Sequence, residues 1–142
     1  MKNLRTEIII NGSAEKVWTV LTDFEKYPEW NPFIVSITGK PDVGSTIRAE
    51  LKNGSSTSVF KPEVMVFEKN KAFEWLGSLP VPGIFNGHHC FHIESISANQ
   101  VKFIQEENFS GLLAGIIMNK IGEQTRAGFI SMNKALKERA EK

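Results

Sequence analysis

Residues 85–111 read FNGHHCFHIESISANQVKFIQEENFSG and carry the most regular pattern in the chain. Apolar and polar side chains alternate on both sides of the turn sequence SANQ. An alternation with a period of two is typical of strands that bury one face, and a short connection between two such strands predicts an antiparallel hairpin. We therefore predict strands over residues 84–96 and 101–109.

The alternation also sorts the side chains of this hairpin into two faces. The inward set is Phe85, Gly87, His89, Phe91 and Ile93 in the first strand, and Val101, Phe103, Gln105, Glu107 and Phe109 in the second. Three of these residues, His89, Gln105 and Glu107, are polar groups directed into an apolar concavity. A polar group that is buried without a partner destabilises the fold. These three either satisfy one another or water in a filled core, or they line a cavity and orient a ligand.

Shorter alternations, separated by turn residues, fill the preceding part of the chain and indicate an antiparallel meander. We predict further strands at 6–10, 33–38, 45–52, 56–67 and 71–79, which makes seven strands in one curved sheet. Asn53 and Gly54 are the predicted central pair of a hairpin turn, because both residue types adopt positive φ. Pro62 predicts a bulge or an edge position within 56–67. Phe73 and Trp75 belong to the inward face.

Apolar residues at helical spacing follow the first strand. They are Ala14, Val17, Trp18 and Leu21, and they predict a helix that starts at about residue 14. The next segment, FEKYPEWNPFI at 24–34, contains two prolines that forbid a long helix. Its many rings indicate a short, irregular segment that packs over something apolar.

The C-terminal part of the chain, near residues 111–138, predicts one long helix packed along the sheet. Its apolar stripe contains Leu113, Ile117, Ile121, Thr125, Phe129, Met132 and Leu136. Gly115, Gly122 and Gly128 interrupt this segment, and glycine in a helix interior is unfavourable. We expect the helix to bend at these glycines or another group to approach its backbone there.

Length and composition restrict the class of protein. The chain has 142 residues, of which 41% are hydrophobic and 23% are charged, and this fits a single globular domain over residues 1–142. A net charge of +1 gives no general attraction for nucleic acid. The single cysteine, Cys90, and an N-terminus without a signal-peptide pattern favour the cytoplasm. The longest apolar patch, 112–118, is far shorter than the roughly 20 residues that span a membrane.

The first strand of the hairpin carries histidine and cysteine residues, which can bind metals or act in nucleophilic catalysis. His88, Cys90 and His92 alternate on its outward face, but about 13 Å separates the Cα atoms of the two histidines, so we expect no metal site. Cys90 and the neighbouring His89 point to opposite faces and cannot form a nucleophile–base pair.

Two stretches resemble the SRPBCC superfamily, which includes START-like, birch-pollen-allergen-like and polyketide cyclase/dehydrase proteins. The late hairpin of that family has the pattern Gly-x-His-x-Phe-x-(Ile/Leu), a turn, and Phe-x-Gln-x-Glu-x-Phe-x-Gly. Here these positions are Gly87, His89, Phe91, Ile93, Phe103, Gln105, Glu107, Phe109 and Gly111. The segment SAEKVWTVLTDFEKYPEWNPFI, at 13–34, is similar to the family's helix and its Tyr-Pro-x-Trp-Asn-Pro segment. Together the matches touch both ends and nearly the whole chain.

The resemblance implies an α+β helix-grip fold. In this fold a curved seven-stranded antiparallel sheet wraps around a long C-terminal helix, and two short helices follow the first strand. A hydrophobic pocket lies between the sheet and the helix. Trp30 and Phe33 would plug one end of the grip.

We expect the chain to bind a hydrophobic small molecule, such as a lipid or a polyketide-like compound, in this pocket. The candidate ligand-binding residues are Trp30, Phe33, Phe73, Trp75, His89, Phe91, Phe103, Gln105, Glu107, Ile117 and Ile121. One alternative is an enzyme of the polyketide cyclase or dehydrase type that uses Glu107 and His89 as acid and base. The other is a regulatory module that binds proteins. No cofactor is expected, and the ligand and the oligomeric state are left open.

Overall fold

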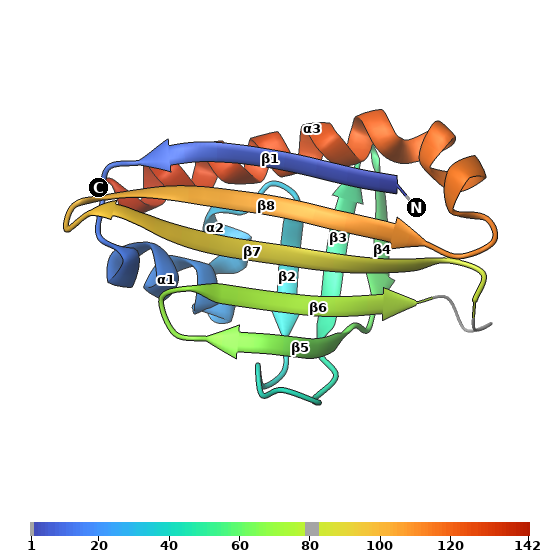
Figure 1. Ribbon diagram of the computed structural model, residues 1–142, viewed down its shortest axis with the longest axis horizontal. Coiled ribbons are helices and arrows are strands. Elements are labelled where there is room, and N and C mark those ends of the chain that lie inside the picture. The colour runs from blue at the N-terminus through green and yellow to red at the C-terminus, as the bar shows by residue number, and fades with distance from the viewer. Residues whose placement is uncertain (1, 79–82) are drawn as a thin grey trace.

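The computed structural model describes residues 2–78 and 83–142 and contains a curved five-stranded antiparallel sheet (Figure 1). Its strands lie in the order β1-β8-β7-β6-β5. They span β1 (Lys2–Ile10), β5 (Glu63–Glu68), β6 (Ala72–Ser78), β7 (Asn86–Ser97) and β8 (Gln100–Ser110). The last residue of the strand expected at 71–79 lies outside the described residues.

The hairpin of β7 and β8 has the register that the alternation predicts. His89 lies opposite Glu107, and Phe91 lies opposite Gln105. His89, Phe91, Phe103 and Gln105 are buried, whereas Glu107 is only partly so. The prediction of an inward and an outward face is therefore confirmed for this hairpin.

The remaining strands form a separate sheet, which corrects the predicted single seven-stranded sheet. This second sheet has the order β2-β3-β4, with β2 (Ile34–Thr38), β3 (Arg48–Asn53) and β4 (Ser56–Phe60). The predicted strand at 56–67 is divided between the two sheets at Lys61 and Pro62. Proline has no N–H for a ladder, so the first pairing ends there and the chain passes from one sheet into the other.

The turn between β3 and β4 is shifted by one residue from its predicted place. Asn53 pairs with Ser56, so Gly54 and Ser55 form the turn. Of the two turn residues, only Gly54 has a positive φ, at 63°. Asn53 is consequently the last residue of β3 instead of the first residue of the turn.

The long helix α3 (Ala114–Ala140) packs along the inner face of the five-stranded sheet (Figure 1). It begins three residues later than predicted because Gly111, with φ of 110°, turns the chain after β8. The amides of Leu112 and Leu113 then donate to the carbonyls of Gly83 and Ile84. None of the helices in the described residues has the length and apolar character needed to cross a bilayer.

Gly128 marks a close approach to α3. A Cβ atom at Gly128 would lie 2.4 Å from the ring of Phe33, which packs edge-on against Phe129 at 5.6 Å between ring centroids. Glycine at this position thus admits an aromatic ring, and the space beside it is filled. By contrast, a Cβ atom at Gly115 or Gly122 would meet no short contact.

The two short helices predicted after the first strand are present. They are α1 (Ala14–Thr22) and α2 (Tyr27–Trp30), joined by the 3₁₀ turn η1 (Phe24–Lys26). The Ser13 hydroxyl caps α1 by accepting from the amide of Lys16. Tyr27 is fully buried and donates its hydroxyl to the carbonyl of Leu21. The ring-rich segment therefore packs mainly into the core beside α1, as its prolines and rings predict.

Candidate functional site

A cavity of about 170 Å³ lies between the two sheets and the first half of α3. It is located toward the end of the molecule where β6 and β8 end and β7 begins, and α1 lies at the opposite end (Figure 1). Its lining consists of Phe33, Leu51, Asn53, Phe60, Gly77, Ser78, Phe85, Gly87, Glu107, Phe109, Ile121 and Thr125. Most of this wall is apolar, which is typical of sites for small organic ligands.

Glu107 is the one ionisable residue among the described residues that line the cavity. Its position in β8 places the side chain over Gly87, where a Cβ atom would lie 2.1 Å from the carboxylate Oε2. Glycine in β7 therefore provides the space that the carboxylate occupies. The other oxygen, Oε1, lies 3.2 Å from Nδ1 of His89.

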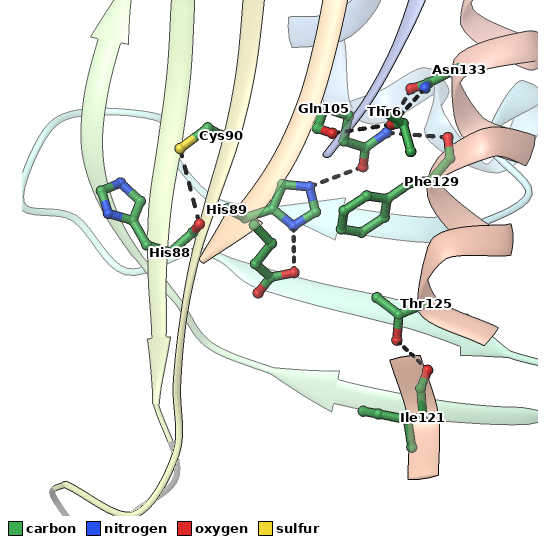
Figure 2. A network of polar contacts seen from close by, with 10 residues as sticks. Thr6, His88, His89, Cys90, Gln105, Ile121, Thr125, Phe129 and Asn133 are labelled. Atoms are coloured by element: carbon green, nitrogen blue, oxygen red, sulfur yellow. Dashed lines mark hydrogen bonds and ion pairs between the residues drawn. The ribbon is translucent and has the colours of Figure 1, made fainter. Parts of the chain in front are cut away.

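His89 is fully buried and connects Glu107 to a chain of polar side chains (Figure 2). Its Nε2 lies 2.9 Å from Oε1 of Gln105. The Gln105 amide nitrogen lies 2.8 Å from Oδ1 of Asn133 and 3.4 Å from the carbonyl of Phe129. Asn133 donates to the Thr6 hydroxyl, which donates to the carbonyl of Gln105. The buried chain is therefore closed at a backbone carbonyl.

The direction of this chain fixes one proton on His89. A backbone carbonyl can only accept, so the Gln105 atom that faces Phe129 must be the amide nitrogen. The Gln105 oxygen consequently faces Nε2 of His89, and Nε2 must carry a proton. Nδ1 then faces the Glu107 carboxyl group at 3.2 Å, a distance at which one proton between the two groups would link them. This arrangement can transfer a proton between the buried histidine and a group in the cavity.

Asn53 supplies a second polar group to the cavity wall. Its Oδ1 is buried and has no hydrogen-bond partner among the described residues. An unpaired buried acceptor destabilises a fold, and a ligand that donates a hydrogen bond would relieve the cost. Glu107 and Asn53 therefore give the mostly apolar cavity two acceptors, in addition to the hydroxyl groups of Ser78 and Thr125.

The structure places three of the eleven candidate ligand-binding residues in the cavity wall: Phe33, Glu107 and Ile121. His89 and Gln105 lie behind Glu107 in the buried chain. The other six residues lie outside the lining, namely Trp30, Phe73, Trp75, Phe91, Phe103 and Ile117. Four of these rings fill the core, with Phe73 and Phe91 5.7 Å apart and Trp75 and Phe91 5.4 Å apart between centroids.

Trp30 and Ile117 differ from those core rings. Trp30 is partly exposed at the end of α2, where it packs on Tyr27 at 5.2 Å between ring centroids. Ile117 is half-buried in the second turn of α3. Neither side chain reaches the cavity described here.

Several cavity and network residues were not among the candidates. Phe85 and Phe109 were on predicted inward faces, and Leu51 lies in the predicted strand 45–52, so alternation could have identified all three. Asn133 lies four residues after Phe129 on α3, so its helical spacing places it on the buried stripe. Thr6 and Asn53 carried no such signal, because their roles depend on which strands become neighbours.

Comparisons with known proteins agree with this fold. The sequence profile described as polyketide cyclase / dehydrase and lipid transport matches residues 1–141. No curated protein sequence gives a significant match.

Solved structures with the same architecture include the Zhui aromatase/cyclase from Streptomyces sp. R1128, at 13% identity and a TM-score of 0.77 over 99% of this chain and 93% of that one. A START superfamily protein from Mycobacterium smegmatis has 20% identity and a TM-score of 0.75, over 98% and 97%. Norcoclaurine synthase from Thalictrum flavum has 13% identity and a TM-score of 0.74, over 98% and 93%. At these identities the likeness shows the helix-grip fold, as the sequence resemblance predicted.

Proposed function

Because the chain belongs to the polyketide cyclase / dehydrase and lipid transport family, we propose that it binds a hydrophobic small molecule in the cavity between the two sheets and α3. The observation that carries this proposal is an apolar wall interrupted by one carboxylate, Glu107, whose position is fixed from behind by His89. A cavity that served no ligand would gain stability from a larger side chain at Gly77, where a Cβ atom would meet no short contact.

The cavity restricts the chemistry of the ligand. A volume of about 170 Å³ accommodates roughly one aromatic ring or a short acyl segment, so a longer ligand extends toward the surface. The Glu107 carboxylate lines the cavity with Oε1 facing His89, and Oδ1 of Asn53 has no hydrogen-bond partner among the described residues. The ligand therefore combines an apolar ring or chain with at least one hydroxyl or N–H donor.

A second candidate is an enzyme that moves a proton on this ligand. The buried chain from Thr6 to His89 supports it, because a carboxyl group held by histidine next to an apolar cavity has the arrangement of a general acid or base. In this role Glu107 would exchange a proton with the ligand, and His89 would hold Glu107 in position. Gln105 would keep His89 in the required tautomer.

Native mass spectrometry of the freshly purified chain, followed by solvent extraction, tests the binding proposal. Titration with an environment-sensitive apolar dye then measures cavity occupancy in two variants of α3. Ile121→Trp fills the cavity, whereas Ile130→Trp adds the same ring at an exposed position of the same helix. We expect the wild type and Ile130→Trp to bind dye at a ratio of about 1:1 and Ile121→Trp to lose that binding.

The same experiment distinguishes the alternatives. A wild-type chain that carries no extracted molecule and binds no dye would overturn the binding proposal. A stable protein complex that survives in Ile121→Trp would support the regulatory module instead. Turnover of an extracted compound that is lost in Glu107→Gln would favour the enzyme.

A cytoplasmic location remains part of the proposal and rests on the single cysteine.

A further inference from the structure

Four polar side chains converge on the outer face of the five-stranded sheet. Glu74 on β6 lies between two histidines of β7, with Oε1 2.8 Å from Nε2 of His88 and Oε2 2.7 Å from Nε2 of His92. Cys90 lies directly opposite Glu74 in the register of the two strands. Figure 2 shows His88 and Cys90 on the other side of β7 from His89. This cluster is therefore separate from the cavity.

The pairing of β6 with β7 places a carboxylate from β6 next to the histidines and the cysteine of β7. The spacing within β7 alone does not reveal this ligand. His88 and His92 are too far apart to bind one ion together, and on that ground no metal site was expected. Glu74 comes from the neighbouring strand and stands beside Cys90, midway between the two histidines. One ligand atom from each of Glu74, His88 and Cys90 lies within 4.8 Å of the other two. His88 and Cys90 are only two residues apart, so both can reach one ion together with Glu74.

We propose that Glu74, His88 and Cys90 form a binding site for a zinc ion. Zinc binds carboxylate oxygen, imidazole nitrogen and thiolate sulfur at about 2.0–2.3 Å in tetrahedral geometry, which places ligand atoms roughly 3.3–3.8 Å apart. The contact of 2.8 Å between Glu74 and His88 would lengthen slightly, and the sulfur would move inward. His88 is 40% exposed, so its ring has room for this adjustment.

The charges around the cluster also suit a dication. Glu106 on β8 lies opposite Cys90 on its other side, so carboxylates flank the sulfur on both neighbouring strands. Burial, followed by the charges of Glu74 and Glu106, raises the pKa of the Cys90 thiol to about 12. Zinc binds the thiolate form of cysteine, so binding at this site would release one proton from Cys90. Water would complete the fourth position.

Binding at this site would join β6 to β7 on the face opposite the cavity. A ligand that binds only the folded chain stabilises it by mass action, so zinc should raise the melting temperature. The effect requires no occupant in the cavity. The metal proposal and the proposed function can thus fail independently.

The test uses the full chain, reduced and stripped of metal, and titrates it with Zn²⁺ and with Co²⁺ as a spectroscopic probe. Because Cys90 is the only cysteine, a thiolate-to-cobalt charge-transfer band can arise only from this residue. We expect that band together with the visible bands of tetrahedral cobalt, at one metal per chain. Added zinc should displace cobalt and raise the melting temperature.

Three variants complete the test. Cys90→Ser and His88→Gln should each weaken zinc binding at least tenfold, and Cys90→Ser should abolish the charge-transfer band. Glu94→Gln is the matched control, because Glu94 lies on the same face of β7 and outside the cluster, so its titration should equal that of the wild type. A wild-type chain without the band overturns the proposal, even if a variant fails to fold. Full zinc affinity in either Cys90→Ser or His88→Gln also overturns it.

Discussion

Gly87 and Glu107 occupy one site between them, because the carboxylate of Glu107 fills the volume that a side chain at position 87 would need. A Cβ atom at Gly87 would lie 2.1 Å from Oε2 of Glu107 and 3.2 Å from its carboxyl carbon. The two residues belong to adjacent strands, and Gly87 also lies opposite Gly77 on β6. Small residues on two neighbouring strands thus hold the cavity open beside an oriented carboxylate.

Alanine at position 87 should displace Glu107. We expect Gly87→Ala to lower the free energy of unfolding by about 1–3 kcal/mol, because the carboxylate must leave His89 or the strands must separate. Gly77→Ala is the matched control, since its new methyl would meet Phe60 at an ordinary 3.5 Å and should leave stability unchanged or raised. Urea denaturation of both variants makes the comparison. Equal stability in the two would mean that the Glu107 carboxylate is not held over Gly87 and moves aside without cost.

Replacing the carboxyl group of Glu107 by an amide should preserve the fold. In Glu107→Gln the amide N–H can donate to Nδ1 of His89, so we expect a loss of stability below about 1 kcal/mol. Glu107→Ala leaves Nδ1 unpaired and should cost about 1–3 kcal/mol. Denaturation curves for both variants, with Glu106→Gln on the outer face as control, measure these differences.

The outcome at Glu107 also distinguishes the two interpretations of the inward polar groups, which either satisfy one another in a filled core or line a cavity and orient a ligand. If Glu107→Gln is as unstable as Glu107→Ala, the charge of Glu107 serves to stabilise the fold. The hypothesis that Glu107 orients a ligand in the cavity then loses its main support. If the amide variant is stable, affinity for an extracted ligand that donates to the carboxylate should fall about tenfold. Affinity that stays unchanged would show that this ligand does not contact Glu107.

The sequence predicts the β7–β8 hairpin well because one face of each strand is buried. A shift of one residue would expose Phe91 and Phe103 and bury Lys102, so alternation specifies the register. The same signal does not distinguish one sheet from two. Alternation looks alike in both sheets, and Pro62 is compatible with a bulge, an edge or a passage between sheets.

Alternation gives the face of a residue but not whether the space in front of it is filled. Phe91 and Phe103 share the inward face with Glu107, yet they lie further along the hairpin, where other rings fill the core. Glu107 and Phe109 lie near the open end. The extent of the cavity depends on how α3 and the second sheet pack, and neither is contained in the pattern of a single strand.

The buried chain behind the cavity should behave as one unit. Gln105→Leu removes partners from His89, Asn133 and the Phe129 carbonyl, and should lower stability by about 1–3 kcal/mol or more. Asn133→Leu removes the other partner of the hydrogen bond between the Gln105 amide and the Asn133 side chain on α3. The double variant should lose less than the sum of the two by about 0.5–3 kcal/mol, as determined by denaturation of all four proteins.

Thr125→Ala provides the control for the comparison of Gln105→Leu, Asn133→Leu and their double variant. Its hydroxyl donates to the carbonyl of Ile121 within α3 and takes no part in the chain from Thr6 to His89. Its effect should add to that of Gln105→Leu within about 0.5 kcal/mol. Additive behaviour of Gln105→Leu and Asn133→Leu would instead argue that the buried contacts form independently.

Two glycines of α3 should respond in opposite directions to alanine. Gly122→Ala places its methyl at an ordinary distance of 3.7 Å from Met118 and should raise the free energy of unfolding by roughly 0.5–1 kcal/mol, because alanine favours the helix. Gly128→Ala would set a methyl 2.4 Å from the Phe33 ring and should lower that free energy by about 1–3 kcal/mol. Since Phe33 lines the cavity, dye affinity should change in Gly128→Ala and stay constant in Gly122→Ala. Thermal and urea denaturation with dye titration test both outcomes, and a stabilised Gly128→Ala variant would show that Phe33 does not pack on this helix.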